Sequence, residues 1–219
     1  MANKSIVLNA LIFLSAITSI GLDYKGSSLY YLFKPLTTIL VILLPLLTSF
    51  INQTLKKTLL GALCFCLLGD VLLLNPNYFV FGLVAFLIAH LLFAKLFISL
   101  KGFQKNGTTA IFLLGIVVGL YLWLYPDLGA LKYPVAAYVM VILVMAWQGI
   151  SVYLKERRRI YGLLALGAMF FMFSDSIIAV DKFRFPFKLS GAVILSTYWL
   201  AITLIANSFI LDLEATKSS

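Results

Sequence analysis

The sequence predicts an all-α membrane protein, a polytopic bundle of eight transmembrane helices in a single domain, residues 1–219. Of its residues, 63% are hydrophobic and 11% are charged, and the mean hydropathy is +1.06. A soluble domain averages about 45–50% apolar and about 25% charged residues, so this chain has too little polar side chain to cover a water-soluble globule. A membrane-spanning helix needs about 20 mostly apolar residues, and eight such runs follow one another along the chain.

The runs are separated by short breaks with the residue types of turns and loops. They cover residues 5–20, 30–50, 58–74, 78–100, 109–125, 133–153, 160–180 and 188–210. A tight turn at Asn75-Pro76-Asn77 separates the third run from the fourth, because proline fixes φ and asparagine tolerates turn conformations. Pro126 and Asp127 end the fifth run, and the charged residues 155–159 end the sixth. No loop is long enough for a soluble domain, so we expect the function to reside among the helices.

Lysine and arginine residues in the loops predict the orientation. The side that holds both termini carries twice as many as the other side, which has Lys25, Lys132, Lys182, Arg184 and Lys188. Basic residues favour the cytoplasmic side of a membrane, so both termini are predicted to be cytoplasmic. We expect a multi-pass protein of a bacterial inner (cytoplasmic) membrane. The net charge of +9 is explained by loops that contact anionic lipid, and no nucleic acid partner is expected.

Five ionisable side chains lie inside the apolar runs: Lys34, Asp70, His90, Lys95 and Asp175. A charge near the bilayer centre costs at least about 2.5–3.5 kcal/mol, so such residues are functional candidates by default. A rise of about 1.5 Å per residue places three of them, Lys34, Asp70 and Asp175, roughly 6–8 Å inside the face opposite the termini. His90 is predicted near mid-membrane, and Lys95 can extend to the cytoplasmic headgroups. Structural roles are the alternative: Lys34 can extend to headgroups, and Asp70, Asp175 and His90 can serve as hydrogen-bonding partners.

Two carboxyl groups at one depth predict a shared polar pocket. They do not both ionise easily in a medium of low dielectric constant, and a nearby Lys34 would hold one as carboxylate and leave the other protonated. This arrangement suits general acid catalysis with stabilisation of a cation. It also suits proton-coupled transport, and the residues alone do not separate the two.

Four segments together resemble the lysoplasmalogenase (YhhN-like) family of membrane proteins: Lys34-Pro35, Gly69-Asp70, the string from Gly82 to His90, and Phe173-Ser174-Asp175-Ser176. Their order and spacing match over nearly the whole chain, as do the length and the eight helices. Two positions depart from the family's pattern. Phe93 stands where the family often has tyrosine, and Ile202 follows the Tyr-x-x-Ala segment where it often has glutamine.

The resemblance implies hydrolysis of the vinyl ether bond of lysoplasmalogens to a fatty aldehyde and glycerophosphoethanolamine or glycerophosphocholine. Such a bond is cleaved by protonation of its β-carbon, addition of water to the oxocarbenium ion and collapse of the hemiacetal. Asp70 and Asp175 are the expected general acid and the stabilising or base carboxylate, in either order. The expected partners are a lysophospholipid substrate and membrane lipids, with no cofactor and no metal. The expected substrate-binding residues are Lys34, His90, Ser174, Asn75 and Tyr198.

Two other functions stay open at this point. A small proton-coupled transporter would also use intramembrane acids, and it requires a cavity that opens alternately to both sides. A lipid-binding protein without enzymatic activity would lose stability when its aspartates are replaced, with no turnover to lose. A hydrolase instead requires a dead-end cavity that opens to lipid or to one face.

Overall fold

The computed structural model describes the backbone of residues 2–47 and 52–217 and the side chains of residues 4–47 and 52–209. These ranges form eight α-helices, which confirms the predicted all-α fold class. The helices are α1 (Ala2–Tyr24), α2 (Tyr30–Leu47), α3 (Gln53–Leu72), α4 (Phe79–Lys101), α5 (Gly107–Leu124), α6 (Lys132–Glu156), α7 (Arg159–Phe183) and α8 (Ser190–Lys217), with short 3-10 turns η1 (Pro76–Tyr78), η2 (Tyr125–Asp127) and η3 (Gly129–Leu131). The expected end of the second run, residues 48–50, lies outside the described residues.

Seven of these helices are long and apolar enough to cross a membrane, and α3 is not among them, since it carries more charged residues than the others allow. The reason lies in its sequence, because α3 contains Lys56, Lys57 and Asp70. It nevertheless belongs to the bundle. Leu59 and Leu63 of this helix are fully buried, and α3 packs against both α2 and α4. The chain is therefore an integral, multi-pass membrane protein.

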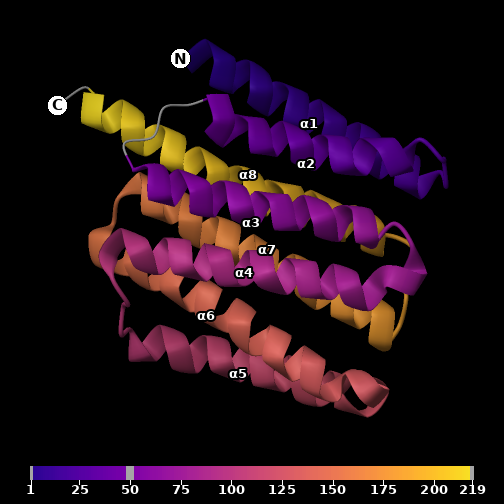
Figure 1. Ribbon diagram of the computed structural model, residues 1–219. Coiled ribbons are helices and arrows are strands. Elements are labelled where there is room, and N and C mark those ends of the chain that lie inside the picture. The colour runs from indigo at the N-terminus through magenta and orange to yellow at the C-terminus, as the bar shows by residue number, and fades with distance from the viewer. Residues whose placement is uncertain (1, 48–51, 218–219) are drawn as a thin grey trace.

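Seven helices close into a ring around one core, in the order α1, α2, α3, α4, α6, α7 and α8, with α8 packed on α1 and α2. Helix α5 lies outside this ring and packs mainly on α6 (Figure 1). Both chain ends lie at one end of the bundle. We call the opposite end, which holds the connections α1–α2, α3–α4, α5–α6 and α7–α8, the distal end.

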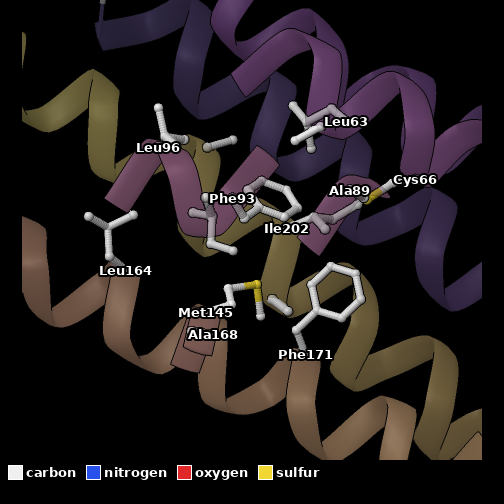
Figure 2. Packing of buried hydrophobic residues seen from close by; sticks show 14 of the residues in the cluster. Leu63, Cys66, Ala89, Phe93, Leu96, Met145, Leu164, Ala168, Phe171 and Ile202 are labelled. Carbon is white, nitrogen blue, oxygen red and sulfur yellow. The ribbon is translucent and has the colours of Figure 1, made fainter. Parts of the chain in front are cut away.

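The core is built from large apolar side chains that meet at the centre of the ring. Figure 2 shows Leu63, Phe93, Met145, Phe171 and Ile202, which come from α3, α4, α6, α7 and α8. All five are fully buried. Since the lipid outside the ring is as apolar as these side chains, close packing and interhelical hydrogen bonds hold such a bundle together.

Helices α1 and α7 extend past their predicted ends at the distal end of the bundle. Helix α1 continues to Tyr24 and is followed by Gly26, whose φ of +65° begins the turn. Helix α7 continues to Phe183. Its last turn contains the charged residues Asp181 and Lys182, which are tolerated there because the helix ends near the membrane surface. Pro186 follows and disfavours helical conformation in the residue before it. The extension of α7 places Asp175 about 12 Å from the helix end rather than the predicted 7–8 Å.

Helices α7 and α8 approach each other closely at Gly167. A Cβ atom at this position would lie 2.7 Å from Ile205 Cγ1 and 2.8 Å from the backbone oxygen of Ala201. The glycine is therefore required for the approach of the two helices. Gly115 on α5 instead has open space around it, since a Cβ there would meet nothing within 4 Å.

We expect Gly167→Val to destabilise the bundle, because overpacking costs about 1–3 kcal/mol and each kcal/mol lowers the Tm of a chain of this size by about 2–4 °C. Thermal unfolding in detergent micelles measures the change. Gly115→Val is the matched control and should leave Tm nearly unchanged. Equal losses in the two variants would contradict the assigned contact.

Candidate active site

The first polar group inside the ring surrounds Asp70, and we call Asp70, Thr38, Tyr198 and Trp199 the Asp70 cluster. The hydroxyls of Thr38 and Tyr198 donate to Asp70 Oδ2 at 2.5 and 2.8 Å. The indole N–H of Trp199 in turn donates to Thr38 Oγ1 at 3.1 Å. Asp70 is only 1% exposed. The cluster therefore joins α2, α3 and α8 through a carboxyl group that is closed off from its surroundings.

Lys34 lies near this cluster without pairing directly with it. Its side chain is buried, and its ammonium lies 5.8 Å from the centroid of the Tyr30 ring. Asp70 and Asp23 are the carboxyl groups within electrostatic range of Lys34. Among the described residues Lys34 makes no ion pair, so any effect on Asp70 acts through space.

The second polar group contains Asp175, His90 and Tyr138, which we call the Asp175 triad. His90 Nε2 lies 2.7 Å from Asp175 Oδ2, and the Tyr138 hydroxyl donates to the same oxygen at 2.5 Å. Nε2 and the Tyr138 hydroxyl lie 3.0 Å apart. Since a carboxylate oxygen only accepts hydrogen bonds, Nε2 carries the hydrogen when Asp175 is ionised. The triad joins α4, α6 and α7.

Asp175 differs from Asp70 because it reaches a cavity. The cavity holds about 60 Å³ between α4, α5, α6 and α7, which is room for several water molecules. Most of its walls are apolar, and Asp175 and Tyr138 lie among them. The Asp175 side chain is 10% exposed. Both hydrogen bonds within the described residues end on Oδ2, so Oδ1 is left for the cavity.

Two aromatic rings separate the two polar groups. Phe86 lines the cavity, and its ring centroid lies 5.6 Å from that of Tyr198 in the Asp70 cluster. Phe171 lies 4.4 Å from His90 and 5.5 Å from Tyr198, centroid to centroid. Asp70 is not among the residues found to line the cavity in the described part of the chain. The two aspartates are thus neighbours across an aromatic wall, and each has its own set of hydrogen bonds.

The other predicted site residues lie at different places. Ser174 is fully buried and donates to the carbonyl of Ile194 at 3.0 Å, which fastens α7 to α8 beside Asp175. Asn75 lies at the distal surface, where its side chain accepts from Asn77 N and caps η1. Of the predicted binding residues, the structure brings His90 to Asp175 and Tyr198 to Asp70.

Tyr138, Thr38 and Trp199 are partners that sequence reasoning did not single out. Tyrosine, threonine and tryptophan are ordinary residues in apolar runs, so composition does not mark them. One available signal was the position of Tyr138, well inside its run rather than at the interface, where membrane tyrosines gather. Among the described residues no group of three or more His, Cys, Asp or Glu side chains is arranged to hold a metal ion.

Comparison with known proteins agrees with the family resemblance of the sequence. The model of the YhhN family matches residues 29–209. The bovine protein named lysoplasmalogenase TMEM86A is 38% identical over 162 residues, which cover 71% of this chain and 66% of that protein. Human lysoplasmalogenase TMEM86B is 34% identical over 157 residues, 69% of this chain and 63% of that protein. The chain thus matches slightly less than two thirds of these relatives' length.

A bacterial relative matches over a greater length. The Escherichia coli O157:H7 protein named uncharacterized membrane protein YhhN is 26% identical over 200 residues, 90% of this chain and 96% of that protein. No solved structure matches the chain significantly.

The hydrogen bonds of the Asp70 cluster can be tested by stability. Thr38→Val keeps the side-chain shape but removes the donor to Asp70 and the acceptor of the Trp199 N–H. An unpaired buried polar group costs about 1–3 kcal/mol, so we expect a lower Tm in thermal unfolding. The control is Thr18→Val, because the exposed Thr18 hydroxyl only donates to Leu14 O of its own helix. A Thr38→Val protein as stable as this control would contradict the described network.

Proposed function

The chain belongs to the YhhN family, and from this membership we propose that it is a membrane hydrolase that cleaves the vinyl ether bond of lysoplasmalogens. The proposal is supported by the relatives named lysoplasmalogenase. The observation that carries it is Asp175, a carboxyl group with one anchored oxygen and one oxygen open to an apolar cavity. A lysoplasmalogen brings an alkenyl chain and a bond that is cleaved by acid, and this cavity offers a surface for each.

The first chemical step is proton transfer to carbon. We assign it to Asp175, whose Oδ1 donates its proton to the β-carbon of the vinyl ether, so that a new C–H bond forms and the α-carbon becomes an oxocarbenium ion. The carboxylate that remains is stabilised on Oδ2 by hydrogen bonds from Tyr138 and His90. Such charge-assisted hydrogen bonds are about twice as strong as neutral ones. The negative carboxylate also lies beside the new cation.

The second step is the addition of water. The Asp175 carboxylate accepts a proton from a water molecule as the water oxygen bonds to the α-carbon, which gives a hemiacetal and restores the carboxylic acid. The hemiacetal then loses the glycerol oxygen as an alcohol and becomes the aldehyde. One carboxyl group thus serves as acid and then as base, as carboxyl groups do in retaining glycosidases.

We assign Asp70 a supporting role, because Phe86 and Phe171 lie between it and the triad. A second negative charge across this wall favours a cation in the cavity, since electrostatic effects are strong in a medium of low dielectric constant. Tyr198 orients Asp70, Ser174 holds α7 in place, and Lys34 balances the charge of Asp70 from a distance. His90 acts by its hydrogen bond to Asp175.

The place of the cavity favours hydrolysis over transport. Its lining includes the distal ends of α4, α5 and α7, such as Phe79, Leu124 and Phe183, as expected for a cavity that opens toward one face. With cytoplasmic termini, as the loop charges predict, this face is the outer side of a bacterial inner membrane. An amphiphilic lipid can enter there with its headgroup at the surface.

We expect Asp175→Asn to reduce fatty aldehyde release from a lysoplasmenyl lipid by about 100- to 10,000-fold, the usual contribution of general acid–base catalysis. Asparagine keeps the shape but cannot deliver the proton. The measurement is aldehyde release by purified protein, with Tm as a check of folding. Asp181→Asn is the control on the same helix, because asparagine can still accept the hydrogen bond from Phe187 N. Full activity of a folded Asp175→Asn protein would refute the assignment.

Asp70→Asn is expected to lower kcat by roughly 10- to 100-fold with a smaller change in KM, because it removes an electrostatic effect that strengthens as the cation forms. Steady-state kinetics with the same lipid measure both constants. A rise in KM alone would instead place Asp70 in substrate binding, and unchanged kinetics would leave it a purely structural residue.

A further inference from the structure

The distal end of the bundle, beside the cavity, carries a set of basic side chains that the mechanism does not use. Lys132 begins α6 and Lys182 lies in the last turn of α7, both at the distal end. Phe183 and Val135, close to them in sequence, line the cavity. Arg184 lies at the same end and is already paired with Asp127. Lys132 and Lys182 make no ion pair within the described residues.

Aromatic rings hold both ammonium groups beside the cavity. Lys182 Nζ lies 4.8 Å from the centroid of the Phe79 ring, and Phe79 is a lining residue. Lys132 Nζ lies 4.2 Å from the centroid of Tyr125. The cavity residue Tyr121 packs on Tyr125 and donates its hydroxyl to the backbone oxygen of Lys132 at 3.1 Å. A ring face attracts a cation without an ordinary acceptor atom, so the N–H donors stay available for an anion.

We propose that Lys182 and Lys132 form a binding site for the phosphodiester of the lysophospholipid substrate, at the mouth of the cavity that ends at Asp175. This inference rests on the proposed function and adds the residues that recognise the headgroup. Charge complementarity selects the ligand: two cations that make no ion pair within the described residues lie close to residues that line an apolar cavity, which suits a lipid with one anionic group.

The length of the substrate agrees with this placement. Lys182 lies about 10 Å along the α7 axis from Asp175, at a rise of about 1.5 Å per residue. In a lysoplasmalogen about seven bonds separate the phosphorus from the β-carbon of the vinyl ether, which is roughly 8 Å when extended at the bond spacing of a polypeptide backbone. With its phosphate at Lys182, the substrate therefore places the reacting carbon near Asp175.

Lys188 provides a matched comparison at the same end of the bundle. Its ammonium also lies over a ring, 5.3 Å from the centroid of Tyr24. It borders a different hollow, between α1, α7 and α8, in which Asp23 and Asp181 supply carboxyl groups. Lys188 thus shares the exposure and ring contact of Lys182 but lies away from the cavity.

Binding of non-cleavable ligands tests the proposal without turnover. The two probes are an alkyl-lysophosphocholine, whose saturated ether resists hydrolysis, and the matching alkylglycerol, which lacks the phosphate. Affinity is measured for the full chain in nonionic micelles by the quenching of tryptophan fluorescence. We expect Lys182→Met and Lys132→Met each to weaken binding of the phospholipid by about tenfold, the value of one charge-assisted hydrogen bond, and to leave alkylglycerol binding unchanged.

Further variants decide between a specific site and general surface charge. Lys182→Arg should keep most of the affinity, and Lys188→Met should keep all of it. Equal weakening by Lys188→Met and Lys182→Met, or equal loss of both ligands, would overturn the phosphate site. Aldehyde release from the vinyl ether lipid is assayed separately. Selective phospholipid binding without aldehyde release would refute the hydrolase and retain the binding site. Aldehyde release together with unchanged phospholipid binding by the lysine variants would support the hydrolase and refute the binding site.

Discussion

The structure depends on one constraint: a polar group inside a membrane protein must find its hydrogen bonds within the protein. Asp70 and Asp175 each meet it with two bonds from other helices. The first set joins α2, α3 and α8, and the second joins α4, α6 and α7. Six of the seven ring helices are therefore tied to an aspartate, and the seventh, α1, is held by reciprocal amide bonds between Asn9 and Asn207. The groups that carry the proposed chemistry also fix the order of the helices.

Glycine residues explain how two aspartates in one core come to have different access. A Cβ at Gly69 would lie 2.6 Å from the Phe86 ring, so the glycine beside Asp70 makes room for the aromatic wall. Gly82 allows α4 to approach Leu73, because a Cβ there would lie 2.6 Å from Leu73 Cδ2. Together they seat α4 closely on α3. The wall closes off Asp70, and Asp175 keeps one oxygen toward the cavity.

The sequence was sufficient for the fold class and for the ionisable residues, because composition and isolated charges in apolar runs are local properties. It was not sufficient for their partners. Tyr138 reaches Asp175 because α6 packs on α7, and it reaches His90 because α6 also packs on α4. The sequence of one helix does not show which other helices will pack against it. The depths predicted from the sequence also put His90 and Asp175 apart, with His90 near mid-membrane and Asp175 close to the surface, although the two side chains are hydrogen-bonded in the structure. The longer α7 brings the two together, since three added residues deepen Asp175 by about 4–5 Å.

The two departures from the family's pattern can now be located. Phe93 lies one turn beyond His90, and its ring centroid is 6.1 Å from that of Phe171. Ile202 lies one turn beyond Tyr198, and both departures are fully buried in the core of Figure 2. Neither is among the described residues that line the cavity. A tyrosine and a glutamine at these positions would therefore place their polar groups in the buried core rather than at the surface of the cavity. The apolar side chains found here suit that buried environment, and the lining of the cavity does not depend on either position.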